Sequence, residues 1–333
     1  MIDLRERARL TRSAVVERGV RRSDRTVGAA LVYHRVAATT GSPDLEVSPA
    51  LGRTAFGAEL EYLLRRYAVV PPSRLPAAIA ARRPGEPVPV ALTFDDDTRS
   101  HVDDVLPVLA STGAVAGFYV AGWRLHGDPR PWWELLQLAA DHGRLEPSVP
   151  PLTATAVTAV SRREPGAIRR LAHELELLEP EARRTIEADL AKRTEDLEAD
   201  AGLDGAALRL LAQRHEVGFH TRLHDRLSAR DDTGLEEALL DGRAALEEAI
   251  GRTIDSIAYP HGDADERVAA AARRAGYALG LAGSNRAATS ADDRLLLPRL
   301  SPWHTTLGTF ALTLARALAS APRAGAAARH RRS

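Results

Sequence analysis

Residues 88–97 constrain the fold of this chain more than any other stretch. They read Val-Pro-Val-Ala-Leu-Thr-Phe-Asp-Asp-Asp, so an apolar and β-branched run ends abruptly at three carboxylates. Such a run is typical of a buried parallel strand, whose acids must emerge at its C-terminal end. In barrels of alternating strands and helices, the loops at that end converge on one opening, where chemistry is usually housed. The alternative is that the three acids only cap a helix starting near Ser100, since aspartate is a preferred N-cap residue.

A second stretch, residues 217–224, favours the functional interpretation of these acids. It is another short apolar run, and it ends in two histidines four positions apart, His220 and His224. Carboxylates and imidazoles at strand ends are the ligand types of a divalent metal with a general base beside it. If the chain turns helically after Phe219, both imidazoles lie on one face and reach one ion.

Strands and helices alternate on both sides of a long middle segment. Besides the run that ends at the carboxylates, the predicted strands are 28–36, 67–70, 115–120, 216–219, 254–259, 277–281 and 295–300. The predicted helices are 56–64, 73–82, 102–109, 234–250, 266–275 and 307–318. This alternation favours a parallel sheet that is closed, or nearly closed, by helices.

The alternation stops between Gly122 and Leu211. Leucines and isoleucines recur there at helical intervals among Arg and Glu, which predicts a helical insertion over or beside the barrel. Trp132 and Trp133 lie near its start, and adjacent tryptophans can stack on sugar rings. Two large aromatics at a helix start more often anchor that helix, so we prefer the structural interpretation. The chain is thus divided into an N-terminal arm (1–26), a catalytic domain (27–320) that contains the insertion, and a disordered tail (321–333).

The motifs together resemble those of the polysaccharide deacetylases, carbohydrate esterases that share the NodB homology domain. Residues 93–97 are similar to the family's Thr-Phe-Asp-Asp-Gly motif, and residues 220–224 to its His-Ser/Thr-x-x-His motif. Residues 258–262, Ala-Tyr-Pro-His-Gly, resemble a variant of the third motif, and 31–36 resemble the first strand. The resemblance covers roughly residues 28–300 apart from the insertion. It implies an α/β fold, a distorted (β/α)7 barrel of the NodB type with a helical insertion.

The resemblance also implies the roles of the site residues. Asp96, His220 and His224 are expected to hold a divalent metal, with Zn²⁺ as the first choice, because three protein ligands leave positions open for water and substrate. Such an ion lowers the pKa of a water to ~7 and holds an oxyanion. Asp95 is expected to take the proton of the attacking water, and the backbone around His261 to stabilise the oxyanion.

Three departures from the family pattern bear on the mechanism. Asp97 replaces the usual glycine and is expected to place a further carboxylate near the metal, affecting the choice of ion or adding a hydrogen bond. Ala258 replaces the arginine that orients the catalytic aspartate, so that support must come from elsewhere or be weaker. The family's general acid is a histidine in a Leu-x-His motif near the last strand, where this chain has no such motif, and His304 is the nearest candidate for that role. Arg299 is another polar group that could point into the mouth of the barrel. For His34, the sequence favours neither a place in the core nor a place at the mouth.

Composition narrows the chemistry. The 45 basic and 45 acidic residues cancel, which offers no electrostatic argument for a nucleic-acid partner or an anionic membrane. The chain has no cysteine, so any metal must take oxygen and imidazole ligands. Residues 1–7 are charged and no apolar stretch is long enough for a signal peptide or a membrane span, so a cytoplasmic location is the default expectation.

These features predict a metal-dependent hydrolase that removes N-acetyl, or less commonly O-acetyl, groups from a sugar-containing substrate. A glycan polymer, a glycan precursor and an acetylated small molecule remain equally acceptable substrates. One alternative is a C–N hydrolase acting on a non-sugar amide or imide. The other is a non-catalytic carbohydrate-binding protein that retains the barrel, which the missing third-motif arginine leaves open.

Overall fold

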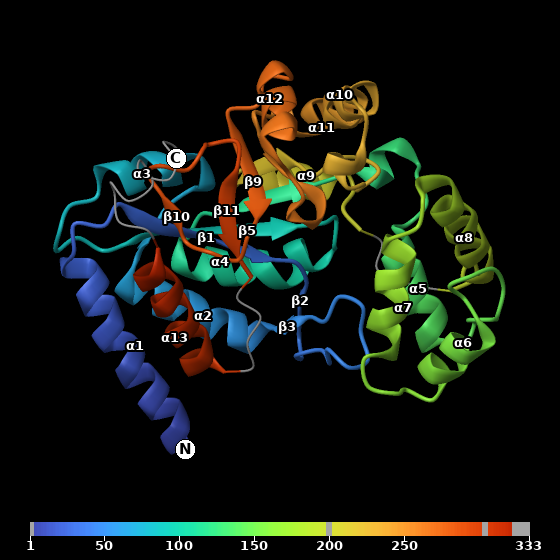
Figure 1. Ribbon diagram of the computed structural model, residues 1–333, viewed down its shortest axis with the longest axis horizontal. Helices are drawn as coiled ribbons and strands as arrows, with labels where there is room; N and C mark the ends of the chain where they lie inside the picture. Colours follow the sequence, from blue (N-terminus) through green and yellow to red (C-terminus); the bar gives the residue numbers. More distant parts are fainter. Residues whose placement is uncertain (1–2, 198–201, 302–305, 322–333) are drawn as a thin grey trace, which may run out of the picture.

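The structure is a computed structural model that describes residues 3–197, 202–301 and 306–321. Seven parallel strands close into a barrel because β1 pairs with β5 on one side and with β11 on the other (Figure 1). In order around the barrel, they are β1 (Val27–Tyr33), β5 (Pro89–Asp95), β6 (Gly117–Val120), β7 (Glu216–Phe219), β8 (Ser256–Ala258), β9 (Leu279–Gly283) and β11 (Leu297–Leu300). The predicted seven-stranded α/β barrel is confirmed.

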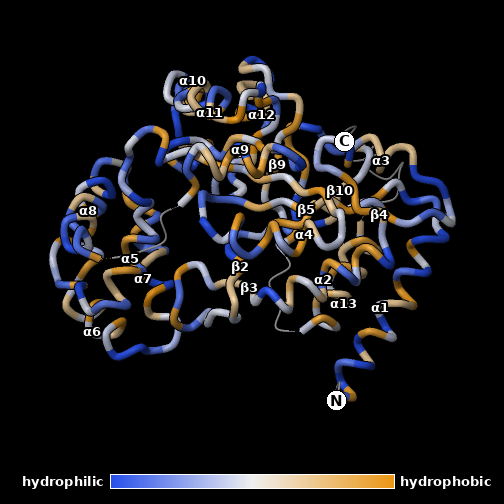
Figure 2. Tube along the Cα trace, turned by 180° about the vertical axis from the view of Figure 1, so that it is seen from behind, coloured by the Kyte–Doolittle hydropathy of each residue, from blue (hydrophilic) through white to orange (hydrophobic). Residues whose placement is uncertain are grey.

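Short strands extend the barrel at its margins. β4 (Ala68–Val69) runs parallel to β5, and β10 (Ala288–Thr289) pairs antiparallel with β1. β2 (Val36–Ala37) and β3 (Leu51–Gly52) form a separate parallel pair beyond the end of β1. Apolar residues run along the central strands, whereas the outer helices alternate hydrophobic and hydrophilic residues (Figure 2), the pattern expected when one helical face covers a sheet.

Helices cover the outside of the barrel. They are α2 (Arg53–Arg66), α3 (Leu75–Ala81), α4 (Leu106–Thr112), α9 (Gly205–Ala212), α10 (Asp232–Leu240), α11 (Arg243–Ile250), α12 (Glu266–Arg274) and α13 (Leu307–Ser320). Three short helical turns lie beside these elements: η1 (Pro72–Arg74) precedes α3, η4 (Leu227–Ala229) follows β7, and η5 (Pro260–Gly262) follows β8. A π-helical turn, η2 (His101–Val105), leads into α4.

The single helix predicted over residues 234–250 is wrong, because the chain breaks between α10 and α11 at Gly242. This glycine has a φ of 87°, which a side chain would strain, and a Cβ there would lie 2.9 Å from Nε2 of His126. Helical periodicity in the sequence continues across the break, so the periodicity alone did not reveal it.

The predicted N-terminal arm contains a long helix, α1 (Leu4–Arg22), that runs alongside α13 (Figure 1). Ser13 and Val20 are buried on its inner face. The hydroxyl groups of Tyr62 and Tyr67, in and just after α2, both donate to Glu17 of this helix. Residues 4–22 are therefore part of the packed molecule. The predicted disordered tail lies outside the described residues apart from Ala321.

The insertion forms a helical lobe beside the barrel (Figure 1). After the short helix η3 (Trp123–His126), it comprises α5 (Trp132–Asp141), α6 (Ala154–Ser161), α7 (Ala167–Glu176) and α8 (Pro180–Arg193). Residues between Trp132 and Leu190 bury their own hydrophobic cluster, separate from the barrel core. By contrast, α9 lies against β7 and contributes Leu208 and Leu211 to the barrel core, so the end of the segment predicted as insertion belongs to the barrel layer.

Within the described ranges, no helix combines the length and apolar content needed to cross a bilayer.

Candidate active site

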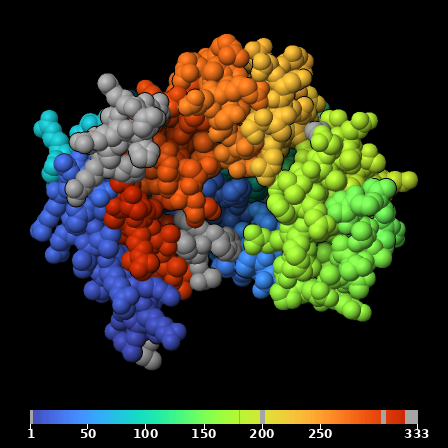
Figure 3. All heavy atoms as spheres, in the orientation of Figure 1, coloured from blue at the N-terminus to red at the C-terminus, as the bar shows by residue number. Residues whose placement is uncertain are grey.

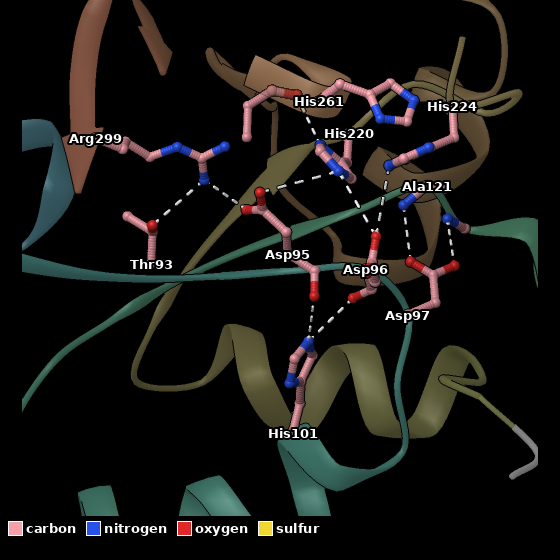
Figure 4. A network of polar contacts seen from close by, with 12 residues as sticks. Thr93, Asp95, Asp96, Asp97, His101, Ala121, His220, His224, His261 and Arg299 are labelled. Atoms are coloured by element: carbon pink, nitrogen blue, oxygen red, sulfur yellow. Dashed lines mark hydrogen bonds and ion pairs between the residues drawn. The ribbon is translucent and has the colours of Figure 1, made fainter. Parts of the chain in front are cut away.

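The carboxyl ends of the barrel strands bring the predicted motifs to one opening (Figure 4). Asp95 is the last residue of β5, and His220 follows β7 directly. Residues 259–262 follow β8, and Arg299 lies within β11. Because all seven strands are parallel, these residues share one end of the barrel, as the sequence predicts.

Three side chains converge there on one point. Oδ1 of Asp96 lies 3.7 Å from Nε2 of His220 and 3.7 Å from Nε2 of His224. The three ligand atoms all lie within 4.8 Å of one another. Asp96 and His224 reach this arrangement with positive φ angles of 71° and 50°, which are uncommon for residues other than glycine. The surrounding fold must therefore hold both backbones in place.

His101 holds the backbone at Asp96. Its Nε2 donates to the carbonyl oxygens of Asp95 and Asp96, at 3.1 and 3.0 Å, from the first turn after the acidic loop. The side chain is fully buried, and burial lowers the pKa of His101, so the ring is neutral and carries its proton on the nitrogen that faces the carbonyls. The sequence analysis missed this residue, although its place at the start of the following helix was visible in the sequence.

The donor set suits a zinc-like ion. His220 donates from Nδ1 to the carbonyl oxygen of Ala258 at 2.8 Å, which leaves the Nε2 lone pair facing Asp96. Burial lowers the pKa of His220 and lowers that of His224 well below its usual value, so both rings are neutral and able to ligate. Zinc bonds of about 2.0–2.2 Å in a tetrahedron separate ligand atoms by roughly 3.4 Å. The two 3.7 Å separations are close to that spacing.

Asp95 is supported by Arg299 in place of the arginine missing from the third motif. Nη1 of Arg299 donates to Oδ1 of Asp95 at 2.7 Å, and both side chains are almost completely buried. Burial alone would raise the pKa of Asp95, but Arg299 and His220 outweigh it and hold that pKa at about 2. The carboxylate is therefore ionised at neutral pH. Its Oδ2 lies 4.0 Å from Nε2 of His220, facing the convergence point.

The carboxylate of Asp97 is not among the three converging groups, so it adds no ligand there, whereas the expected additional hydrogen bonds are present. Its two oxygens accept hydrogen bonds from the backbone N–H groups of Ala121, Gly122 and Trp123, at 2.8, 2.7 and 3.0 Å. Figure 4 shows it turned toward this loop. Burial raises the pKa of Asp97 to about 7, although the three amides oppose that rise. Asp97 joins the loop after β5 to the loop after β6.

The turn that contains His261 contacts the insertion. His261 has a φ of 59°, and its Nδ1 lies 2.8 Å from Oε1 of Glu176 at the end of α7. Arg226 also donates to this carboxylate. The hydrogen bond from His261, together with the charges of His261 and Arg226, outweighs burial and lowers the pKa of Glu176 to about 2. The sequence analysis missed Glu176, because nothing in a helical repeat marks which residue faces the barrel.

A buried ion pair also fixes the insertion to the histidine loop. Arg183 of α8 pairs with Asp225, the residue after His224, and Arg230 pairs with the other carboxylate oxygen. The insertion thus contacts the loops that carry His224 and His261.

A cavity of about 680 Å³ lies between the barrel mouth and the insertion, in the hollow visible in Figure 3. Asp95, Asp96, His220, His224 and His261 line it.

The cavity wall decides two alternatives left by the sequence. His34 is exposed and lines the cavity, so it belongs to the mouth and not to the core. Trp132 is 8% exposed and packs in the core of the insertion, as the structural interpretation expects. Trp133 packs, partly buried, against the same core, and its ring centroid also lies 4.5 Å from that of His224, so this ring reaches the cavity as well. His304, the candidate general acid, lies outside the described residues.

Known proteins resemble this chain in sequence over one segment and in fold over most of its length. Residues 182–280 match the polysaccharide deacetylase family. This span includes His220, His224 and the turn at His261, and the resemblance predicted from the motifs is confirmed. A comparison with curated proteins finds no match.

Several solved structures share the fold at low sequence identity. The deacetylase PplD of Streptococcus pyogenes, in complex with acetate, is 16% identical, with 83% of this chain and 92% of that chain covered and a TM-score of 0.54. IcaB of Ammonifex degensii is 19% identical, with 87% and 97% covered and a TM-score of 0.54. A de-N-acetylase of Aggregatibacter actinomycetemcomitans is 14% identical, with 85% and 99% covered and a TM-score of 0.52.

Proposed function

We propose that this protein is a metal-dependent deacetylase that removes N-acetyl, or less commonly O-acetyl, groups from a sugar-containing substrate. The observation that carries the proposal is the convergence of Asp96, His220 and His224 beside the ionised Asp95 in the cavity. The fold is that of solved deacetylases, one of them a de-N-acetylase, which favours an acetamide as the reacting group.

The roles of the residues follow from their positions. Asp96, His220 and His224 would hold the metal, which when bound supplies Lewis acidity and lowers the pKa of a water to ~7. Asp95 accepts the proton of the attacking water on Oδ2, because Arg299 occupies Oδ1 and fixes the orientation of the carboxylate. Arg299 gives Asp95 the support that the missing third-motif arginine would give, which favours an enzyme over a non-catalytic carbohydrate-binding protein.

The remaining walls position the substrate. The sharp turn at His261 and Gly262 lines the cavity. The N–H of Gly262 donates to the carbonyl of Tyr259 at 2.9 Å, so the backbone N–H of His261 is the proposed donor to the oxyanion. Trp133 presents an aromatic ring beside His224, where it can stack on a sugar. A volume of about 680 Å³ lies within the roughly 300–1,000 Å³ of sites for small ligands, so the cavity holds a sugar unit with its neighbours.

Two substitutions at adjacent acids test the assignment. Asp96→Ala removes one of three ligands, so both zinc content and acetate release from N-acetylglucosamine oligomers should fall. Asp95→Asn leaves the ligands in place, but its amide cannot accept the proton. Zinc should stay bound while turnover drops by on the order of 10²–10⁴-fold.

Metal analysis and acetate release are measured on the same preparations. Loss of zinc in Asp95→Asn and its retention in Asp96→Ala would show that the two roles are reversed. Unchanged acetate release in both variants would place the chemistry elsewhere.

A further inference from the structure

The cavity has a side arm that the proposed reaction does not use. This arm, of about 310 Å³, shares six of its lining residues with the main cavity, namely Val32, His34, Val47, Ser48, Arg169 and Ser301. Its remaining walls come from the chain after β1 and from the loop before β3. The described residues that line it are Val32, Tyr33, His34, Arg35, Pro43, Val47, Ser48, Pro49, Leu51, Arg169 and Ser301.

The arm carries uncompensated positive charge. Arg35 and Arg169 are both exposed and line it, and no aspartate or glutamate is among its described lining residues. Within the parts of the chain that the structure describes, neither guanidinium has a hydrogen bond or ion pair. The arginines around the reaction centre differ, since Arg183, Arg226 and Arg299 each pair with a carboxylate.

Backbone hydrogen bonds fix the walls of the arm. The N–H of Gly166, next to the start of α7, donates to the carbonyl of Asp44 at 2.9 Å and so places Arg169 one turn further along. The N–H of Val47 donates to Oε1 of Gln137 in α5 at 2.8 Å. On the opposite wall, the carbonyl of Arg35 accepts from the N–H of Leu51 at 2.9 Å. The two arginines are therefore presented by elements that are joined to each other.

We propose that this arm binds an anionic group, a carboxylate or a phosphate, carried by the acylated sugar substrate. This inference rests on the proposed function, since it names the substrate class of the same cavity. A guanidinium offers paired N–H donors that match the oxygens of either group. At the reaction centre Arg299 is already paired with Asp95, and Asp96 with the two histidines would hold a divalent ion, so the guanidinium groups of the arm are the cations available to the anionic group. The substrate is thus an acidic amino sugar or a phosphorylated one.

Equilibrium binding tests the arm apart from catalysis. The zinc-loaded full chain with Asp95→Asn, which slows turnover, is titrated by calorimetry with N-acetylglucosamine, N-acetylglucosamine 6-phosphate and N-acetylmuramic acid. Both anionic probes, or the one whose anion the arm accepts, should bind at least ten-fold more tightly than the neutral sugar. The tighter of the two identifies the anion as phosphate or carboxylate.

Variants of the two arginines locate the effect. Arg35→Gln and Arg169→Gln should each weaken binding of the preferred anionic probe roughly ten-fold or more, with little change for the neutral sugar. Arg170→Gln is the matched control, because Arg170 is the next exposed arginine on α7 and donates instead to the carbonyl of Pro165. Added salt should weaken the anion preference, since the arm is open to solvent. All variants should unfold at the wild-type temperature.

The outcomes separate this inference from the proposed function. Equal affinity for all three probes, including no detectable binding of any, overturns the inference, as does an equal loss of affinity in Arg170→Gln. If the anion preference depends on Arg35 and Arg169 but the wild-type enzyme releases no acetate, the arm stands and the deacetylase proposal fails. If acetate is released but its release depends neither on the anionic group nor on the two arginines, the deacetylase proposal stands and the inference about the arm fails.

Discussion

The three adjacent acids of the central strand have three different partners. Asp95 pairs with Arg299 across the barrel, and Asp96 faces the two histidines. Asp97 accepts from backbone amides of the next loop. Side chains at consecutive strand positions alternate between two faces, but the positive φ at Asp96 interrupts that alternation and sends each carboxylate in its own direction. Adjacent residues of one type can therefore have unrelated roles.

A substitution at Asp97 tests its structural role. In Asp97→Ala, the N–H groups of Ala121, Gly122 and Trp123 lose their acceptor, so the free energy of unfolding at pH 8 should fall by about 2–4 kcal/mol. Zinc content should stay at the wild-type value, because Asp97 is not among the three converging ligands. Urea denaturation and metal analysis measure the two effects. Zinc loss as large as that of Asp96→Ala would instead return Asp97 to the metal site.

At the scale of elements, α2 packs a carboxyl group into the barrel core. Glu59 is 2% exposed, and the hydroxyl of Tyr33 in β1 donates to its Oε2 at 3.1 Å. Burial raises the pKa of Glu59 to about 8, and the hydrogen bond from Tyr33 only partly opposes that rise. The folded state therefore binds this proton more tightly than the unfolded state, where glutamate titrates near its ordinary value of 4.5.

The stability of the wild-type protein should accordingly depend on pH through Glu59. The proton is bound in both states below pH 4.5, and stability is lost as the pH rises from about 4.5 to about 8. Glu59→Gln removes this titration. As the pH rises through this range, the free energy of unfolding of the variant should increase relative to that of wild type by on the order of 3 kcal/mol. Urea denaturation at pH 5, 6.5 and 8 measures the gain. Glu61→Gln, an exposed residue of the same helix, should show no such trend.

At the scale of the whole molecule, the described residues form three hydrophobic clusters, of which two lie in the barrel and one lies in the insertion. The barrel core includes the strands and α9, whereas the insertion core includes α5, α6, α7 and α8. Contacts such as the buried Arg183–Asp225 pair join the two parts beside the reaction centre. A protein built this way can open one part locally while the other stays folded.

Matched leucine substitutions test this independence. Leu171, 2% exposed, lies in the insertion core, and Leu208, 0% exposed, lies in the barrel core, both within helices. Each Leu→Ala change should lower the free energy of unfolding of the part that contains it by about 2–5 kcal/mol. Hydrogen exchange followed by mass spectrometry should show lost protection confined to residues 132–191 for Leu171→Ala, but spread over the barrel strands for Leu208→Ala. Equal loss in the barrel strands for both variants would mean a single cooperative unit.

The sequence by itself indicated the barrel and the three side chains, Asp96, His220 and His224, that converge at its mouth. The apolar run that ends at Asp95, the alternation of strands and helices, and the spacing of His220 and His224 are all local patterns. Local patterns follow from the periods of strand and helix and from the ligand preferences of metals, which do not depend on distant parts of the chain. The predicted strand 216–219 has the bounds of β7 for the same reason, whereas other element ends differ by a few residues.

Tertiary structure alone decided which distant residues complete the site. Arg299 supports Asp95 only because barrel closure places β11 beside β1, and β1 beside β5. Glu176 reaches His261, and Trp133 reaches His224, only because the insertion docks on the mouth. These pairings join segments far apart in sequence, so no local period or motif encodes them. The contacts of Glu176 and Trp133 depend on how the insertion, which packs its own core, lies against the barrel.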